Sequence, residues 1–77
     1  MLKQIQLELQ ATLKRFLPGT HGSYAIEPGL RIRDLLVKLG IPEHEVNLVF
    51  INGSPANLDS TINGGERVVL YPPLGGG

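Results

Sequence analysis

The sequence predicts an α+β fold, in which a mixed sheet of four to five strands is covered on one face by one main helix. Three observations lead to this prediction. Ile5, Leu7 and Leu9 alternate with polar residues, as in a strand with one buried face. One apolar stripe at helical spacing occupies the middle of the chain. Two further apolar runs, 46–51 and 67–71, are typical of strands.

The helix is the clearest local prediction. Apolar residues recur at i, i+3, i+4 and i+7, which makes one stripe along a helix. These residues are Ile32, Leu35, Leu36 and Leu39. Gly40 is a natural C-terminal stop, and Pro42 forbids continuation. We therefore expect a helix that ends at about residue 39 and packs its stripe into the core.

The remaining elements follow from turn signals. Residues 23–27 form a second short strand that Pro28 and Gly29 close, and Asn52-Gly53 is a turn signal after residues 46–51. The segment 11–17 is ambiguous, although its apolar spacing allows a helical turn against the core. The loop 54–65 wanders to the last strand, 67–71, which Pro72 ends.

The order strand, strand, helix, strand, strand matches the β-grasp, or ubiquitin-like, arrangement. The first two strands pair as a hairpin, and a single helix can cover only one face of the sheet. We assign residues 1–71 to this domain. Residues 72–77, Pro-Pro-Leu-Gly-Gly-Gly, form a flexible C-terminal tail.

Composition narrows the range of partners. Seven Lys and Arg balance seven Asp and Glu, which argues against nucleic-acid binding through a strongly basic face. No run of like charge suggests a membrane patch. The chain has no cysteine, and its alternating N-terminus reads neither as a signal peptide nor as a membrane span. We therefore expect a cytoplasmic protein without nucleic-acid or membrane partners.

Strand parity predicts an uncovered apolar patch. If the inner positions of the strands face the helix, four apolar residues face away from it, and exposed apolar patches mark partner sites. These residues are Leu48, Phe50, Val69 and Tyr71. Two alternatives remain open. A register slip by one residue exchanges the faces, and the segment 11–23 could fold over the patch.

No set of side chains predicts catalysis or a metal site. His21 and His44 are far apart in the sequence and lack the spacing of metal ligands. Asp59, Ser60 and Thr61 place hydroxyls beside a carboxylate without a nearby base, so they read as turn formers. We expect no bound metal and no tightly bound cofactor.

Three stretches in the second half resemble the small sulfur-carrier proteins of molybdopterin and thiamin biosynthesis. They are 51–53 (Ile-Asn-Gly), 65–68 (Gly-Glu-Arg-Val) and 72–77 (Pro-Pro-Leu-Gly-Gly-Gly). The chain departs from the family pattern at two positions. Glu66 stands where the family has Asp, and Gly75 stands where it has Ala or Ser.

The resemblance implies a function for the chain terminus. The carboxylate of Gly77, preceded by Gly76, would be adenylated with ATP by an E1-like enzyme and converted to a thiocarboxylate by a sulfur donor. Leu74 and Gly75 would join the apolar patch in binding partners, which include the activating enzyme and a synthase large subunit. In this role the chain is a carrier and not a catalyst.

Two other functions stay open. The segments 16–18 (Phe-Leu-Pro) and 39–53 resemble ubiquitin-like domains that are fused to nuclease-type modules in bacteria. Such domains need not carry a reactive tail, so the chain could be a non-reactive interaction module. A ubiquitin-like modifier, conjugated through the same terminus, is the other alternative.

Overall fold

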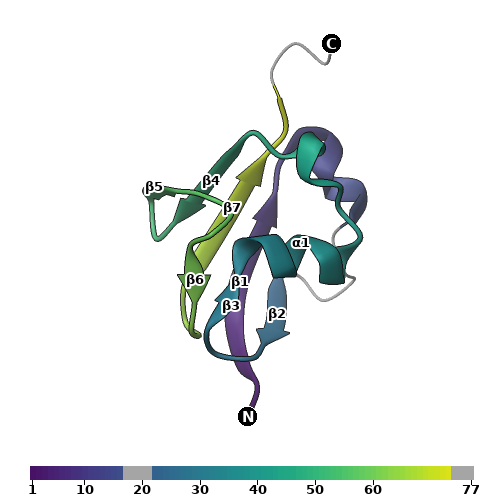
Figure 1. The fold of residues 1–77 in the computed structure, drawn as a ribbon. Coiled ribbons are helices and arrows are strands. Elements are labelled where there is room, and N and C mark those ends of the chain that lie inside the picture. Colours follow the sequence, from purple (N-terminus) through teal and green to yellow (C-terminus); the bar gives the residue numbers. More distant parts are fainter. Residues whose placement is uncertain (17–21, 74–77) are drawn as a thin grey trace.

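The computed structural model describes residues 1–16 and 22–73. A five-stranded sheet has the order β2-β1-β7-β4-β5. Its strands are β1 (Lys3–Leu9), β2 (Ser23–Ile26), β4 (Leu48–Ile51), β5 (Ser54–Ala56) and β7 (Arg67–Tyr71). The helix α1 (Ile32–Leu39) lies across this sheet, as Figure 1 shows. A second, two-stranded sheet pairs β3 (Leu30–Arg31) with β6 (Thr61–Ile62).

The sheet is mixed, as predicted. β1 and β2 form the expected antiparallel hairpin, and β4 runs antiparallel to β7. β1 and β7 pair in parallel at the centre of the sheet. This parallel pair joins the first and the last strand of the chain, so it fixes the C-terminal strand between the two hairpins.

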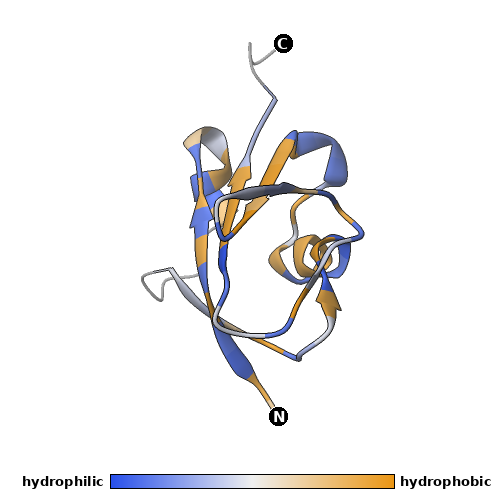
Figure 2. Cartoon of the chain, turned by 90° about the vertical axis from the view of Figure 1, so that its left-hand side faces the viewer, coloured by the Kyte–Doolittle hydropathy of each residue, from blue (hydrophilic) through white to orange (hydrophobic). Residues whose placement is uncertain are grey.

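One hydrophobic core fills the space between the helix and the sheet. Figure 2 shows the helix on one side of the sheet, with segments coloured as hydrophobic in both. The stripe residues Ile32, Leu35 and Leu36 are fully buried, and Leu39 packs against the cluster. The sheet contributes the inner positions of its strands, which include Ile5, Leu7, Val49, Val68 and Leu70.

The predicted helix has the expected end. Gly40 adopts a left-handed conformation (φ 76°), and its N–H donates to the carbonyls of Leu36 and Val37. Only a residue without a Cβ adopts this conformation at little cost, which explains why the helix stops here. The chain then passes through a short 3-10 turn, η2 (Glu43–Glu45), and enters β4 at Leu48, two residues later than predicted.

The ambiguous segment after β1 forms a 3-10 helix, η1 (Ala11–Phe16). Leu13 is fully buried in the core cluster, and Phe16 packs against it. The predicted helical turn against the core is therefore confirmed. Its described part lies with the core and does not fold over the opposite sheet face, whereas residues 17–21 lie outside the described residues.

The loop before β7 is held by Glu66. Its carboxylate accepts hydrogen bonds from the backbone N–H of Asn63 (2.8 Å) and of Gly64 (2.7 Å). Burial raises the pKa of Glu66, but these bonds and one from its own N–H outweigh that influence, so the pKa lies below its usual range. The loop 54–65 is more ordered than predicted, because it contains β5 and β6.

Candidate docking face

The sheet face opposite the helix carries the four residues of the predicted patch. Phe50 lies directly across from Val69, and Leu48 lies across from Tyr71. Residues opposite each other in an antiparallel pair point to the same face. The predicted parity is therefore confirmed, and no register slip has exchanged the faces. We call this surface, with the neighbouring side chains of β1, the open face.

The four patch residues differ in exposure. Leu48 and Tyr71 are 45% and 37% exposed, which is high for large apolar side chains. Phe50 is partly exposed, whereas Val69 is only 9% exposed. Val69 is thus largely covered by its neighbours. The accessible apolar surface comes from Leu48, Phe50 and Tyr71. Whether this surface binds a partner stays a prediction.

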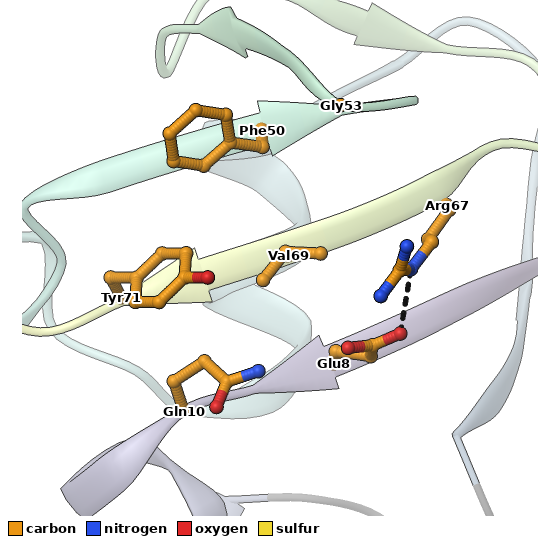
Figure 3. A pocket seen from close by; sticks show the side chains of 7 residues that line it. All are labelled: Glu8, Gln10, Phe50, Gly53, Arg67, Val69 and Tyr71. Carbon is orange, nitrogen blue, oxygen red and sulfur yellow. Dashed lines mark hydrogen bonds and ion pairs between the residues drawn. The ribbon is translucent and has the colours of Figure 1, made fainter.

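An aromatic pair dominates the apolar half of the open face. The rings of Phe50 and Tyr71 meet edge to face, with centroids 5.7 Å apart and planes at 83°. Aromatic rings prefer this geometry because the positive edge of one ring meets the negative face of the other. Together with Val69 the pair borders an open pocket of about 270 Å³. Figure 3 shows the Tyr71 hydroxyl directed along β7 toward Val69.

The other side of the pocket is polar. Glu8 and Gln10 from β1 and its end, together with Arg67 and Gly53, complete the lining. The Arg67 Nε donates to the Glu8 carboxylate at 2.7 Å, as the dashed line in Figure 3 marks. This hydrogen bond lowers the pKa of Glu8 below its usual value and raises that of Arg67. The carboxylate therefore stays ionised at neutral pH.

Sequence reasoning did not identify this ion pair. In the sequence, Glu8 is one of the polar residues that alternate with the apolar residues of β1, and Arg67 belongs to the stretch 65–68. The available signal was parity, because Glu8 and Arg67 both occupy outward positions once β1 and β7 are paired. The register places Glu8 beside Val69 and Gln6 beside Arg67, so the ion pair is a diagonal contact across two parallel strands.

The C-terminal tail begins at one end of the open face. β7 ends at Tyr71, and the next residues, Pro72 and Pro73, leave the sheet there (Figure 1). Pro72 is partly buried and Pro73 is exposed. The remaining predicted site residues, Leu74, Gly75, Gly76 and Gly77, lie outside the described residues. The structure thus places the root of the tail next to the aromatic pair.

Elsewhere in residues 1–16 and 22–73, no three His, Cys, Asp or Glu side chains are grouped so that they could hold a metal ion. His44 is exposed on η2, and His21 lies outside this range.

Asp59 accepts a hydrogen bond from Arg33, which also donates to Glu43 at 2.9 Å. These contacts connect the start of α1 with η2 and with the turn between β5 and β6. No described helix is long and apolar enough to cross a membrane.

Comparison with known proteins identifies relatives. The model of a family described as Mut7-C ubiquitin matches residues 2–75. A comparison with curated proteins returned no match.

Three solved structures share the fold at low sequence identity. The Haloferax volcanii HVO 2177 protein is 20% identical, with a TM-score of 0.71 over 99% of this chain and 88% of that one. A Pyrococcus furiosus protein described as putative molybdopterin converting factor, subunit 1, is 20% identical, with a TM-score of 0.63 over 94% of this chain and 99% of that one. The small archaeal modifier protein 1 of H. volcanii is 19% identical, with a TM-score of 0.66 over the same shares of the two chains. The predicted β-grasp fold is therefore confirmed.

Proposed function

The chain belongs to the Mut7-C ubiquitin family, and from this premise we propose that it is a ubiquitin-like sulfur carrier. In this proposal an E1-like enzyme uses ATP to adenylate the Gly77 carboxylate. Sulfide from a donor then attacks the acyl-adenylate carbonyl, so the C–S bond forms as the C–O bond to AMP breaks, and AMP leaves a C-terminal thiocarboxylate behind. The sulfur passes on to an acceptor in cofactor biosynthesis of the molybdopterin or thiamin type.

The observation that carries this proposal is the position of the tail root. The last strand lies between the two hairpins of the sheet and delivers Pro72-Pro73 at the edge of the open face. Two prolines stiffen a chain toward an extended conformation. From Pro72 to Gly77 the segment could then reach about 20 Å, at ~3.3–3.6 Å per residue.

The residue types of the tail suit a terminus that enters the active site of another protein. Glycine lacks a Cβ, so a chain ending in Gly75-Gly76-Gly77 passes a narrow channel and allows close backbone approach. Ordering each glycine costs about 1–2 kcal/mol, so the body of the protein must contribute binding energy. The open face supplies a suitable anchor, because aromatic side chains are enriched among the residues that dominate interfaces.

The similar proteins support the same role. One of them is described as a molybdopterin converting factor subunit and another as a modifier protein. We therefore propose three partners for this chain: an E1-like adenylating enzyme, a sulfur donor and a synthase large subunit. In each complex the chain is the substrate or the carrier, with Leu74 and Gly75 in the partner's channel.

Intact mass tests the proposed reaction. The chain ending at Gly77 is incubated with ATP, an E1-like enzyme from the same genome and sulfide as the sulfur donor. We expect a mass increase equal to the exchange of one oxygen for one sulfur, dependent on ATP. The matched control is Lys38→Ala, on the exposed side of α1, which should convert like the unchanged chain. An unchanged mass with saturating enzyme would contradict the carrier role.

A second function is favoured by the family itself. The family model covers residues 2–75, and the sequence also resembles ubiquitin-like domains fused to nuclease-type modules. The alternative is thus a non-reactive interaction module that uses the open face alone. If this alternative holds, deletion of Gly76 and Gly77 should leave partner binding unchanged, and the mass of the chain should not change with ATP. A modifier would instead form an isopeptide-linked product, visible as a larger conjugate.

A further inference from the structure

We infer that Arg67 selects the docking partner by receiving a carboxylate from it, next to an apolar side chain that fills the pocket at Phe50 and Tyr71. The occupant of the open face is therefore a protein surface that pairs an apolar anchor with an Asp or Glu. This inference rests on the proposed function, since it assigns that surface to the E1-like enzyme.

The hydrogen-bonding capacity of the ion pair indicates the partner's chemistry. A guanidinium carries five N–H donors, and a carboxylate offers only acceptors. Among the described residues, Glu8 is the one acceptor bonded to the Arg67 side chain, and it uses the Nε group. The terminal nitrogens of Arg67 still need acceptors when a partner excludes water. A carboxylate satisfies them best, because it binds a guanidinium through two parallel hydrogen bonds.

Exposure favours the same assignment. The side chain of Arg67 is 62% exposed and that of Glu8 is 40% exposed. A partner therefore meets the guanidinium more readily than the carboxylate. Covering an ion pair without supplying further hydrogen bonds is unfavourable, because both charges lose water. A purely apolar partner would leave the Arg67 donors unsatisfied, so the polar half of the face selects against it.

The arrangement along β7 sets the geometry of the partner. Tyr71, at one end, adjoins the tail root, and Arg67 begins the strand at the other end. Four residue steps in a strand span roughly 13 Å, at about 3.3 Å per residue. A partner that holds the tail in its active site must therefore place its apolar anchor at Tyr71, next to the tail root. Its carboxylate must lie roughly 13 Å further along β7, at Arg67.

Glu8 has a positioning role in this arrangement. The hydrogen bond that its carboxylate accepts from Arg67 Nε holds the guanidinium over the sheet, beside the pocket that Val69 helps to line. A guanidinium held in this way loses less side-chain freedom when it binds a carboxylate. Arg67 without Glu8 would keep its charge but not its fixed orientation.

Charge exchange within the pair tests the inference. The dissociation constant is measured between the purified chain and the E1-like enzyme from the same genome, with no ATP present. We expect Arg67→Glu to weaken binding at least about tenfold, and Arg67→Lys to weaken it less, because Lys keeps the charge without the two parallel bonds. The double variant Glu8→Arg, Arg67→Glu restores the internal ion pair but should bind as weakly as Arg67→Glu alone.

Controls separate docking from folding and from chemistry. Lys38→Glu makes the same change of charge on the far side of the molecule and should leave the dissociation constant unchanged. Melting temperatures of all variants identify any that are unfolded, and Arg67→Gln replaces Arg67→Glu if the latter is. At saturating enzyme, Arg67→Glu should still give the ATP-dependent mass change. A wild-type chain that binds but is never converted would contradict the carrier function and leave the Arg67 comparison valid.

Three results would overturn the inference. Recovery of wild-type affinity in the double variant would show that the ion pair acts only within the chain. No measurable binding of the wild-type chain to the enzyme would show that the partner is another protein. Dimerisation of the wild-type chain in sedimentation, abolished by Phe50→Ala, would show that a second copy occupies the face.

Discussion

The side chain of Glu66 helps to place the last strand, β7. Its carboxylate receives backbone N–H groups of Asn63 and Gly64 just before β7 begins. Although burial opposes ionisation, these bonds hold the pKa below its usual range. A group with a lowered pKa in the folded state stabilises the fold above its unfolded pKa. That stabilisation is lost as the pH falls through the folded pKa.

We expect Glu66→Gln to remove this pH dependence. At neutral pH the variant should lose about 1–2 kcal/mol of unfolding free energy, because a neutral amide accepts these bonds more weakly than a carboxylate. Urea unfolding from pH 7 down to acid should show the difference between variant and wild type shrinking as Glu66 is protonated. The control is Glu27→Gln, an exposed carboxylate near the N-terminal amine. A difference independent of pH would contradict the argument.

Gly64 has two independent reasons to be glycine. Its φ is +132°, and a Cβ there would lie 2.5 Å from the Cβ of Lys3. We expect Gly64→Ala to destabilise the fold by about 2–4 kcal/mol, from backbone strain and from the displacement of β1. Gly65→Ala is the matched control, since its φ is +84° but its Cβ would meet open space. Thermal unfolding that ranks the two variants equally would show that the contact with Lys3 is readily relieved.

At the scale of elements, α1 separates core from surface within one turn. Leu36 is fully buried, whereas its neighbour Val37 is 74% exposed. We expect Leu36→Ala to cost about 2–5 kcal/mol, because it removes buried apolar atoms and leaves a cavity. Val37→Ala should change stability by less than about 0.5 kcal/mol. Denaturant unfolding of the two variants measures both values, and similar losses would mean that the stripe is displaced by one residue.

The elements that the sequence predicted are those with strong periodicity. The helix could be predicted because its stripe and Gly40 agree, whereas the inward position of Val49 and Val68 was one of two open parities, because both runs are continuously apolar. The strands β5 and β6 were not predicted, since three and two residues are too short to show a period. Their pairing instead depends on the turn at Asn52, whose positive φ of 53° starts the hairpin, and on long-range contact with β3.

At the scale of the whole molecule, the candidate site depends on a pairing that the sequence does not encode locally. Glu8 and Arg67 are 59 residues apart and meet only because β1 and β7 run in parallel. Of the two strand parities that the sequence leaves open, the one on which the patch is predicted places the apolar half of the open face correctly. The polar half requires the order of strands in the sheet, so it became visible only in the structure.

In the proposed function, docking and reaction belong to different parts of the chain, the open face and the C-terminal tail, so two changes should have opposite effects. Deletion of Gly76 and Gly77 removes no side chain, and the described core extends only from Ile5 to Leu70. We expect this deletion to abolish thiocarboxylate formation with little change in melting temperature. Affinity of the body for the E1-like enzyme should fall only modestly, since the open face is intact.

Phe50→Ala should have the reverse effect. It removes one ring of the aromatic pair and should weaken binding to the E1-like enzyme about 30-fold or more, as expected for a central aromatic anchor. At saturating enzyme the tail should still be converted, because the reacting carboxylate is unchanged. The two variants are compared by titration of the enzyme with an intact-mass readout. A Phe50→Ala chain that is bound normally but never converted would mean that Phe50 aligns the tail within the complex and contributes nothing to docking.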